Sequence, residues 1–280
     1  MMKDQGWKKT IGNLHRSAAA FIKWVMLGSA VGSIVGVMGV LFHFSVEWAT
    51  EMRQQHSWLL FLLPLGGVAI ALLYRQTGME KDMGTNTILE AVRGEHPLRL
   101  RTAPLIFVST VITHLFGGSS GREGAALQIG GSMGARLADW INLDQKEHQM
   151  MIMCGMSSCF AALFGTPLAA TLFGIMVEDV GLAFSVAFVP GFAAALIAYG
   201  VSLACGISPT HFELTAPALS IDSTLLVAVL GVACALVARI FCWLLHTMEH
   251  EMPRRLPNPW VRAVVGGAAV VALSYLMGVG

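Results

Sequence analysis

Long apolar stretches separated by short polar connections dominate the pattern along this 280-residue chain. The first stretch, residues 18 to 44, is long enough to cross a hydrocarbon core of about 30 Å as a helix. Its glycines recur about every four residues, which is typical of a closely packed helix face. Further apolar stretches predict helices at about 57–74, 103–116, 149–164, 166–177, 183–205, 221–247 and 260–279. The pattern therefore predicts an all-α, polytopic membrane protein.

Two segments, 84–95 and 121–142, depart from this pattern. Each begins at a glycine, carries polar residues and is only moderately apolar. They are too short or too polar to be simple membrane spans, and we interpret them as half-helices. Irregular backbone at membrane depth occurs only where protein or a water-filled cavity satisfies its hydrogen bonds, so paired broken segments indicate a transport site.

Composition supports the membrane interpretation and excludes several partners. Hydrophobic residues make up 55% of the chain and charged residues 12%, against about 25% charged in ordinary soluble domains. With a net charge of +1, no global field attracts nucleic acid. The five cysteines lie singly in apolar segments, without the spacing of zinc ligands or of a disulfide framework, and are expected to be buried small hydrophobes. We expect no metal and no cofactor.

Basic residues orient the chain. Residues 1–17 resemble a retained cytoplasmic tail, and further basic residues gather around 75–101 and 254–262. Because cytoplasmic loops carry an excess of Lys and Arg, these three regions should face the cytoplasm. We predict a multi-pass protein of the cell membrane with its N-terminus in the cytoplasm. The connections expected on the opposite side, which carry few basic residues, are 46–56, 136–148 and 206–222.

The stretch GGSSGREGAALQIGGSMG, residues 117–134, places Arg122 and Glu123 at the start of one half-helix. A helix N-terminus inside a membrane protein is a ready anion site, and Gly121 and Gly124 let the backbone approach an ion closely. Glu123 would compete with the anion when charged and vacate the site when protonated, which couples the two ions. The alternative is that Arg122 and Glu123 form a cap or an ion pair. The apolar surroundings favour the functional interpretation.

The motif GREG is followed by a short helix and then by FGTPLAATLFGI at 164–175. This combination resembles the CLC family of chloride channels and anion/proton antiporters, which includes the voltage-gated chloride channels. The family carries GREGP or GKEGP, and its gating, proton-accepting glutamate corresponds to Glu123. A family Gly-Ser-Gly at another half-helix start corresponds to Gly84-Thr85-Asn86. The resemblance implies a CLC-type fold with broken helices and a homodimer whose contact comes from 166–205. It implies anion binding by Gly84, Thr85, Asn86, Gly121, Arg122, Gly124 and Ala125.

Two substitutions and one recurring stretch make the chain similar to the fluoride/proton antiporter branch. Ala125 stands where chloride branches have proline, Thr85 or the neighbouring Met83 stands at the pore serine, and FGTPLA recurs at 164–169. This similarity implies fluoride export coupled to proton movement, with fluoride or chloride and protons as the transported ions and membrane lipid as the surroundings. The alternative is a chloride channel or a chloride/proton antiporter.

The proton route of the chloride antiporters is altered in this sequence. Their internal glutamate corresponds to Val177, a replacement that fluoride-branch members share. The adjacent Glu178 and Asp179 offer another route, although acids there are more typical of a solvated helix end. His114 offers one as well, although a lone histidine is more often a core residue.

Whole family members contain two inverted halves, and this sequence corresponds to only part of them. Residues 1–17 form the tail, 18–206 the first half, and 207–280 the start of an incomplete second half. We therefore also consider an inactive membrane fragment, or a half-transporter completed by another chain. None of the three tyrosines in the sequence matches the position of the family's pore tyrosine: Tyr74, Tyr199 and Tyr275.

A different class is suggested by Gly118-Ser119-Ser120-Gly121, which fits the Gly-x-Ser-Gly pattern of rhomboid-like intramembrane serine proteases. His211 or His246 would then be the base, which must lie within hydrogen-bond reach of the serine. That hypothesis leaves Arg122 and Glu123 unexplained. The sequence favours a transporter and not an enzyme.

Overall fold

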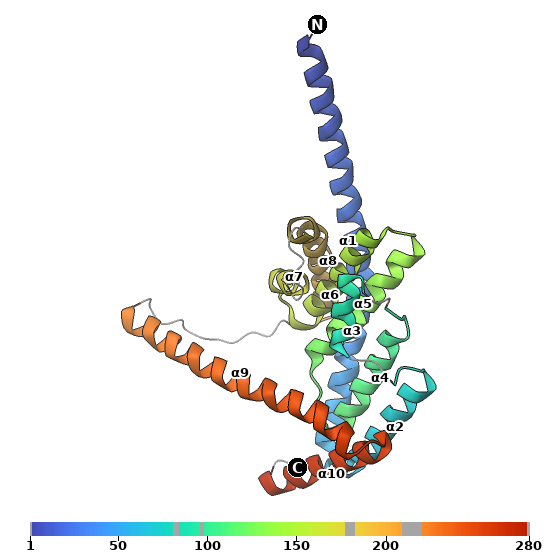
Figure 1. The fold of residues 1–280 in the computed structure, drawn as a ribbon, viewed down its shortest axis with the longest axis vertical. Helices are drawn as coiled ribbons and strands as arrows, with labels where there is room; N and C mark the ends of the chain where they lie inside the picture. The colour runs from blue at the N-terminus through green and yellow to red at the C-terminus, as the bar shows by residue number, and fades with distance from the viewer. Residues whose placement is uncertain (1, 81–83, 96–97, 177–182, 209–219, 279–280) are drawn as a thin grey trace.

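The computed structural model describes residues 2–80, 84–95, 98–176, 183–208 and 220–278, with side chains described from residue 18 and, in the eighth helix, from residue 187. The described residues form helices and contain no β-strand. Figure 1 shows their arrangement. The helices are α1 (Met2–Gln55), η1 (Ser57–Leu62, a 3₁₀ helix), α2 (Leu63–Gln76), α3 (Thr85–Arg93), α4 (Thr102–Leu115), α5 (Arg122–Trp140), α6 (Gln145–Phe164), α7 (Pro167–Met176), α8 (Ala183–Ala204), α9 (Ile221–Arg255) and α10 (Pro259–Met277).

The predicted helices and both predicted half-helices are confirmed, with changes at their ends. The first helix begins at Met2 and continues to Gln55, so the backbone of the predicted tail is helical. Five helical segments among the described residues are long and apolar enough to cross a membrane, and α4 and α7 are shorter apolar helices. The short α3 and the glycine-rich α5 lie among the longer helices (Figure 1).

Backbone-to-backbone packing at glycines holds the core together. A Cβ atom added at Gly130 of α5 would collide with the carbonyl oxygen of Gly155 in α6, and one added at Gly155 would collide with the carbonyl oxygen of Gly130. The predicted glycine face of α1 is confirmed, because it meets α8 in the same way. Small residues allow such close approach, and the resulting dispersion contacts stabilise helix pairs in lipid. The successive α1–α8 contacts pair Gly28 with Pro190, Gly32 with Ala194 and Gly36 with Ala198.

Helix directions follow from these contacts. The rings of Phe42 and Phe107 lie 5.4 Å apart, and Arg53 lies against Gly117, so α1 and α4 run parallel. Gly66 contacts Phe116 at the far end of α4, so α2 runs antiparallel to α4. The contacts of α10 with α2 show that these two helices are also antiparallel. The starts of α1 and α4 and the end of α2 therefore point toward the same side of the bundle, whereas α10 lies at the end opposite the N-terminus (Figure 1). The α10–α2 contacts pair Ala263 with Gly67 and Gly267 with Pro64.

The expected position of the 136–148 connection is wrong. Lys23, near the start of the apolar part of α1 (Ala18–Gln55), forms an ion pair with Glu147 at 2.6 Å. This contact places the connection on the side where the apolar part of α1 begins and not on the opposite side. The prediction counted only basic residues, and this connection has few of them. Its acidic residues belong to the start of α6, where Asp144 caps the helix and Glu147 lies in the first turn.

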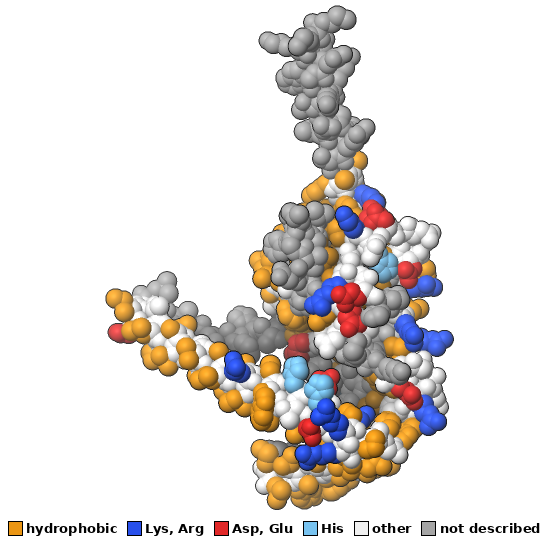
Figure 2. All heavy atoms as spheres, in the orientation of Figure 1, with side chains coloured by type: hydrophobic (Ala, Val, Ile, Leu, Met, Phe, Trp, Pro, Cys, Tyr) orange, Lys and Arg blue, Asp and Glu red, His pale blue; other side chains and the backbone are white. Residues whose placement is uncertain are grey.

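The periphery differs sharply from the core. Helix α9 has no buried residue, and its apolar side chains cover its length in Figure 2. Three of the five cysteines, Cys205, Cys234 and Cys242, are exposed, so the expectation of burial holds only for Cys154 and Cys159. An apolar helix with no buried side chain is compatible with lipid, where apolar side chains need no protein cover.

We predict that Gly32→Ala lowers the stability of the protein in detergent by about 1–3 kcal/mol, because the new methyl group must displace the backbone of α8 at Ala194. The matched control is Gly200→Ala, since a Cβ at Gly200 has no atom within 4 Å. Thermal unfolding followed by circular dichroism measures both. Equal midpoints for the two variants would contradict the packing described.

Candidate functional site: a pocket between two helix starts

The start of α3 has an unusual backbone. Gly84, the residue before the helix, has φ +64°, a left-handed conformation that glycine adopts without steric cost. No side chain caps the helix, and the amide of Thr87 donates to the Gly84 carbonyl at 3.1 Å. The amides of Thr85 and Asn86 precede that turn and have no partner within the helix.

The start of α5 is also uncapped by a side chain. Gly121 is extended, with φ −68° and ψ 134°, and makes no side-chain cap hydrogen bond. The amides of the first turn, from Arg122 to Ala125, belong to the four that an α-helix leaves unpaired. Among the other helices, α2 and α4 also begin without a side-chain cap, whereas α6, α9 and α10 begin with capping side chains: Asp144, Ser220 and Asn258. The alternative in which Glu123 caps α5 or pairs with Arg122 gains no support, because no hydrogen bond or ion pair of the Glu123 carboxylate is present among the described residues.

The two helix starts border one pocket of about 330 Å³. A Cβ atom at Gly124 would lie 3.0 Å from Thr85 Oγ1, so the first turns of α3 and α5 are in direct reach of each other. Side chains of α2 and α4 complete the walls. The lining residues are Ile70, Tyr74, Thr85, Ile106, Ser109, Thr110, Thr113, Ser120, Gly121, Gly124, Ala125 and Gln128.

The predicted site residues divide into two groups. Thr85, Gly121, Gly124 and Ala125 line the pocket together, as the sequence led us to expect. The other predicted residues do not line it. Gly84 sets the start of α3, Asn86 is exposed, and Arg122 is half-buried.

Glu123 lies at the rim of the pocket. Its side chain is exposed, and its Oε2 atom lies 3.1 Å from the position that a Cβ on Gly121 would take. Because Gly121 itself lines the pocket, the carboxylate stands beside the opening and not inside it. This position suits a group that blocks or frees the pocket by rotating its side chain.

Sequence reasoning missed the residues from α2 and α4. Tyr74 lines the pocket, although it does not match the family's pore tyrosine. Ser109 and Thr110 come from α4, which looked like an ordinary apolar helix. Gln128 had a signal that could have found it, because it lies one helical turn after Gly124 and so on the same face of α5.

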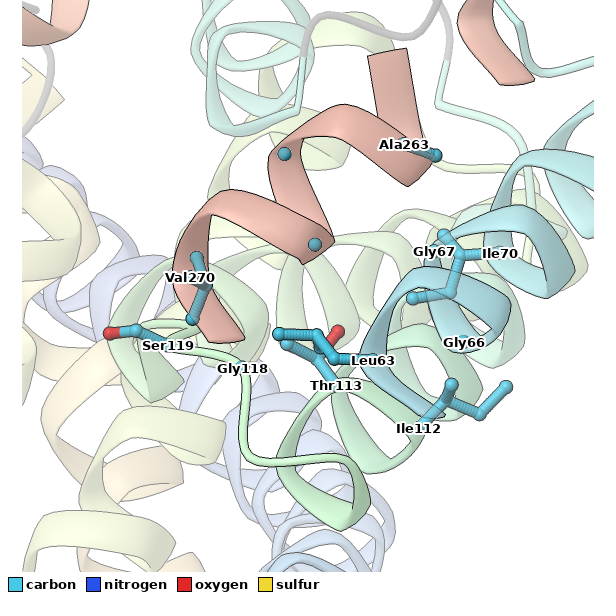
Figure 3. A pocket seen from close by; sticks show the side chains of 12 residues that line it. Leu63, Gly66, Gly67, Ile70, Ile112, Thr113, Gly118, Ser119, Ala263 and Val270 are labelled. Atoms are coloured by element: carbon cyan, nitrogen blue, oxygen red, sulfur yellow. The ribbon is translucent and has the colours of Figure 1, made fainter. Parts of the chain in front are cut away.

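The protease hypothesis loses support from the geometry. Ser119 borders a different pocket of about 220 Å³, between the Gly118–Ser119 loop and α10, where Val270 and Ala263 form the opposite wall (Figure 3). His246 is exposed and borders a third depression with Trp243 and His250. No described histidine lines either serine-bearing pocket. His211 lies outside the described residues, as do Met83, Val177, Glu178 and Asp179.

His114 is half-buried on α4 and does not line the pocket. Its Nδ1 lies 2.8 Å from the carbonyl oxygen of Thr110, one turn earlier in the same helix. This bond gives the imidazole a local backbone partner. Among the described residues, no group of three or more His, Cys, Asp or Glu side chains is placed to hold a metal ion.

The chain is similar to several known proteins. The family model for the voltage gated chloride channel matches residues 66–280. A chloride/fluoride channel protein of Pseudomonas syringae pv. tomato is 32% identical over 258 residues, which cover 91% of this chain and 57% of that protein. An H(+)/Cl(-) exchange transporter of Salmonella arizonae is 29% identical over 166 residues, covering 53% and 35% of the two chains.

Among solved structures, a CLC-type fluoride/proton antiporter superposes with a TM-score of 0.86 at 33% identity, covering 91% of this chain and 65% of that one. A slow cyanobacterial Cl-/H+ antiporter gives 0.74 at 22% identity, which supports the fold alone. The chain therefore belongs to the voltage gated chloride channel (CLC) family and has the CLC-type all-α fold. It spans a little over half the length of the Pseudomonas relative.

We predict that Thr85→Cys combined with Gly124→Cys forms an intramolecular disulfide under mild oxidation, because the two side-chain positions are as close as disulfide geometry requires. The exposed Cys205, Cys234 and Cys242 are first replaced by serine. Mass spectrometry of peptides detects the bond. The control, Thr85→Cys with Gly200→Cys, should stay reduced. A free thiol pair in the first variant would show that α3 and α5 do not meet at the pocket.

Proposed function

We propose that this protein transports anions across the membrane, that fluoride is the exported ion, and that proton movement drives it. The single observation that carries the proposal is the convergence of two helix starts without side-chain caps on one pocket, with Glu123 at its rim. An anion is the ligand that such a place favours, because unpaired amides donate hydrogen bonds and each helix start carries a partial positive charge.

The walls determine what the pocket can hold. Thr85 Oγ1 can donate a hydrogen bond alongside the first-turn amides, while Ile70 and Ile106 contribute apolar surface. Gly121 and Gly124 leave the backbone of α5 open to close approach. An ion that enters exchanges part of its water shell for these fixed donors, which is how selectivity filters compensate for dehydration.

Glu123 is the coupling group in this proposal. When ionised, its carboxylate competes with the anion for the same amides and occupies the approach beside Gly121. When protonated, it loses its charge and turns away, so an anion can pass. Proton uptake and anion passage thus alternate at one residue. This role requires no catalytic chemistry, and we propose that the protein is not an enzyme.

The names of relatives support the choice of ion. The Pseudomonas relative is named a chloride/fluoride channel protein, and the structural neighbour at 33% identity is a fluoride/proton antiporter. Ala125, in place of the proline of chloride branches, lines the pocket. Chloride is the second candidate, because the Salmonella relative is an H(+)/Cl(-) exchange transporter.

The arrangement of charges supports the proposed orientation in the cell membrane. Lys23 lies at the start of the apolar part of α1, Arg101 directly before α4 and Arg75 in the last turn of α2, so all three lie toward the same side of the bundle. Lys and Arg gather on the cytoplasmic side of membrane proteins. We therefore propose that this side, and with it the N-terminus, faces the cytoplasm.

We predict that Glu123→Ala uncouples anion movement from protons. In proteoliposomes loaded with fluoride, the unaltered chain should release fluoride faster when the outside solution is more acidic than the inside, because proton uptake frees the pocket. The variant should lose this pH dependence while it retains flux. Ion-selective electrodes for fluoride and chloride measure both rates.

The matched control is Asp222→Asn, an exposed acid in the first turn of α9, which should behave as the unaltered chain does. Faster release of chloride than of fluoride would favour the second candidate. If neither ion leaves the vesicles and neither binds the detergent-solubilised chain, then independent transport by this chain is refuted, and a fragment or scaffold remains.

We further propose a homodimer whose contact uses α7 and α8. Both helices present exposed apolar side chains, including Leu168, Phe173, Leu196 and Ile197. Ile197→Trp should convert the dimer to a monomer in detergent, because the larger ring prevents close apposition while staying compatible with lipid. The control is Leu230→Trp on α9, which is also exposed. Light scattering coupled to size-exclusion chromatography gives the masses.

A further inference from the structure

Three buried polar side chains in the wall of the pocket have no role in the scheme above: Ser109, Thr110 and Gln128. Two of them carry an unpartnered atom: Ser109 of α4, which is 8% exposed, and Gln128 of α5, which is 6% exposed. Ser109 Oγ and Gln128 Oε1 have no hydrogen-bond partner among the described residues. Leaving such an atom unsatisfied costs about 1–3 kcal/mol, so these two atoms indicate a ligand.

The surrounding bonds fix which atom of Gln128 is free. Its Nε2 donates to the carbonyl oxygen of Gly124 at 3.3 Å, one turn earlier in α5. The amide plane is thereby oriented, and Oε1 is left as a pure acceptor. On the facing helix α4, Thr113 Oγ1 donates to the backbone carbonyl of Ser109 at 2.7 Å. This bond does not use the Ser109 side-chain hydroxyl.

The Gln128 amide oxygen cannot bind a bare anion, because it carries a partial negative charge and has no proton to donate. Gln128 Oε1 requires a donor that can also donate to the anion, and water has two O–H groups. The Ser109 hydroxyl can both accept from such a molecule and donate to an anion. The pocket, at about 330 Å³, holds an ion and several waters, each of which occupies about 30 Å³ in the liquid.

We propose that Ser109 and Gln128 form a water-binding subsite that keeps the anion partly hydrated while the first turns of α3 and α5 hold its other side. This inference rests on the proposed function and names two specificity-determining residues for it. Fluoride is the smaller anion and holds its water more strongly, so a retained water molecule stabilises bound fluoride more than bound chloride. Water bridges of this kind contribute nearly as much as direct hydrogen bonds.

The test compares fluoride and chloride affinity in the detergent-solubilised chain by isothermal titration calorimetry. Gln128→Met keeps the unbranched shape and removes the acceptor, and Ser109→Ala removes the hydroxyl. Each variant should weaken fluoride binding about tenfold, as the loss of one hydrogen bond near a charge predicts, and chloride binding less than about threefold. The double variant should lose little more than either single one, because both residues hold the same water.

The control is Ser132→Ala. Ser132 is a buried hydroxyl of α5 that also has no partner among the described residues but does not line the pocket, so both affinities should stay unchanged. Equal losses for both ions, or no loss, would overturn the subsite. If Gln128→Met does not fold, Ser109→Ala decides, because it removes a single atom. If the unaltered chain binds neither ion, the proposed function fails, which is a separate result.

Discussion

The site depends on backbone amides that no side chain caps at the starts of α3 and α5, inside an otherwise apolar bundle. In water such amides would be solvated, and at an ordinary helix start a side chain would accept from them. Here Gly84 and Gly121 occupy the cap positions and offer no side-chain acceptor. The protein therefore maintains a local excess of hydrogen-bond donors where solvent is restricted, and negative charge is the natural complement.

Close packing elsewhere makes this arrangement possible. Helix α5 is held by buried apolar side chains such as Leu127 and Ile129 and by direct backbone contact with α6 at Gly130 and Gly155. Helix α1, which also contacts α5, is in turn held against α8 by a similar glycine contact at Gly32. Rigid neighbours hold the donors in place before an ion arrives, so binding does not have to order them.

The sequence predicted the helices, both half-helices and four residues of the pocket, because apolar runs and glycine at a helix start are local signals. It could not assign Tyr74 or Ser109, since membership of the pocket depends on how α2 and α4 pack against α5. It misplaced the 136–148 connection, because counting basic residues ignores contacts such as Lys23 with Glu147. The sequence also could not show that the Glu123 side chain is exposed, because that depends on which face of α5 packs against the other helices.

Helix α9 is held much less firmly than the helices of the packed core, because none of its residues is buried. Its 35 residues contribute nothing to the protein interior, so the energy that holds it in place comes from amphiphile molecules along its sides. Thinner bilayers or short-chain detergents should change the tilt of α9 first, well before the pocket is disturbed.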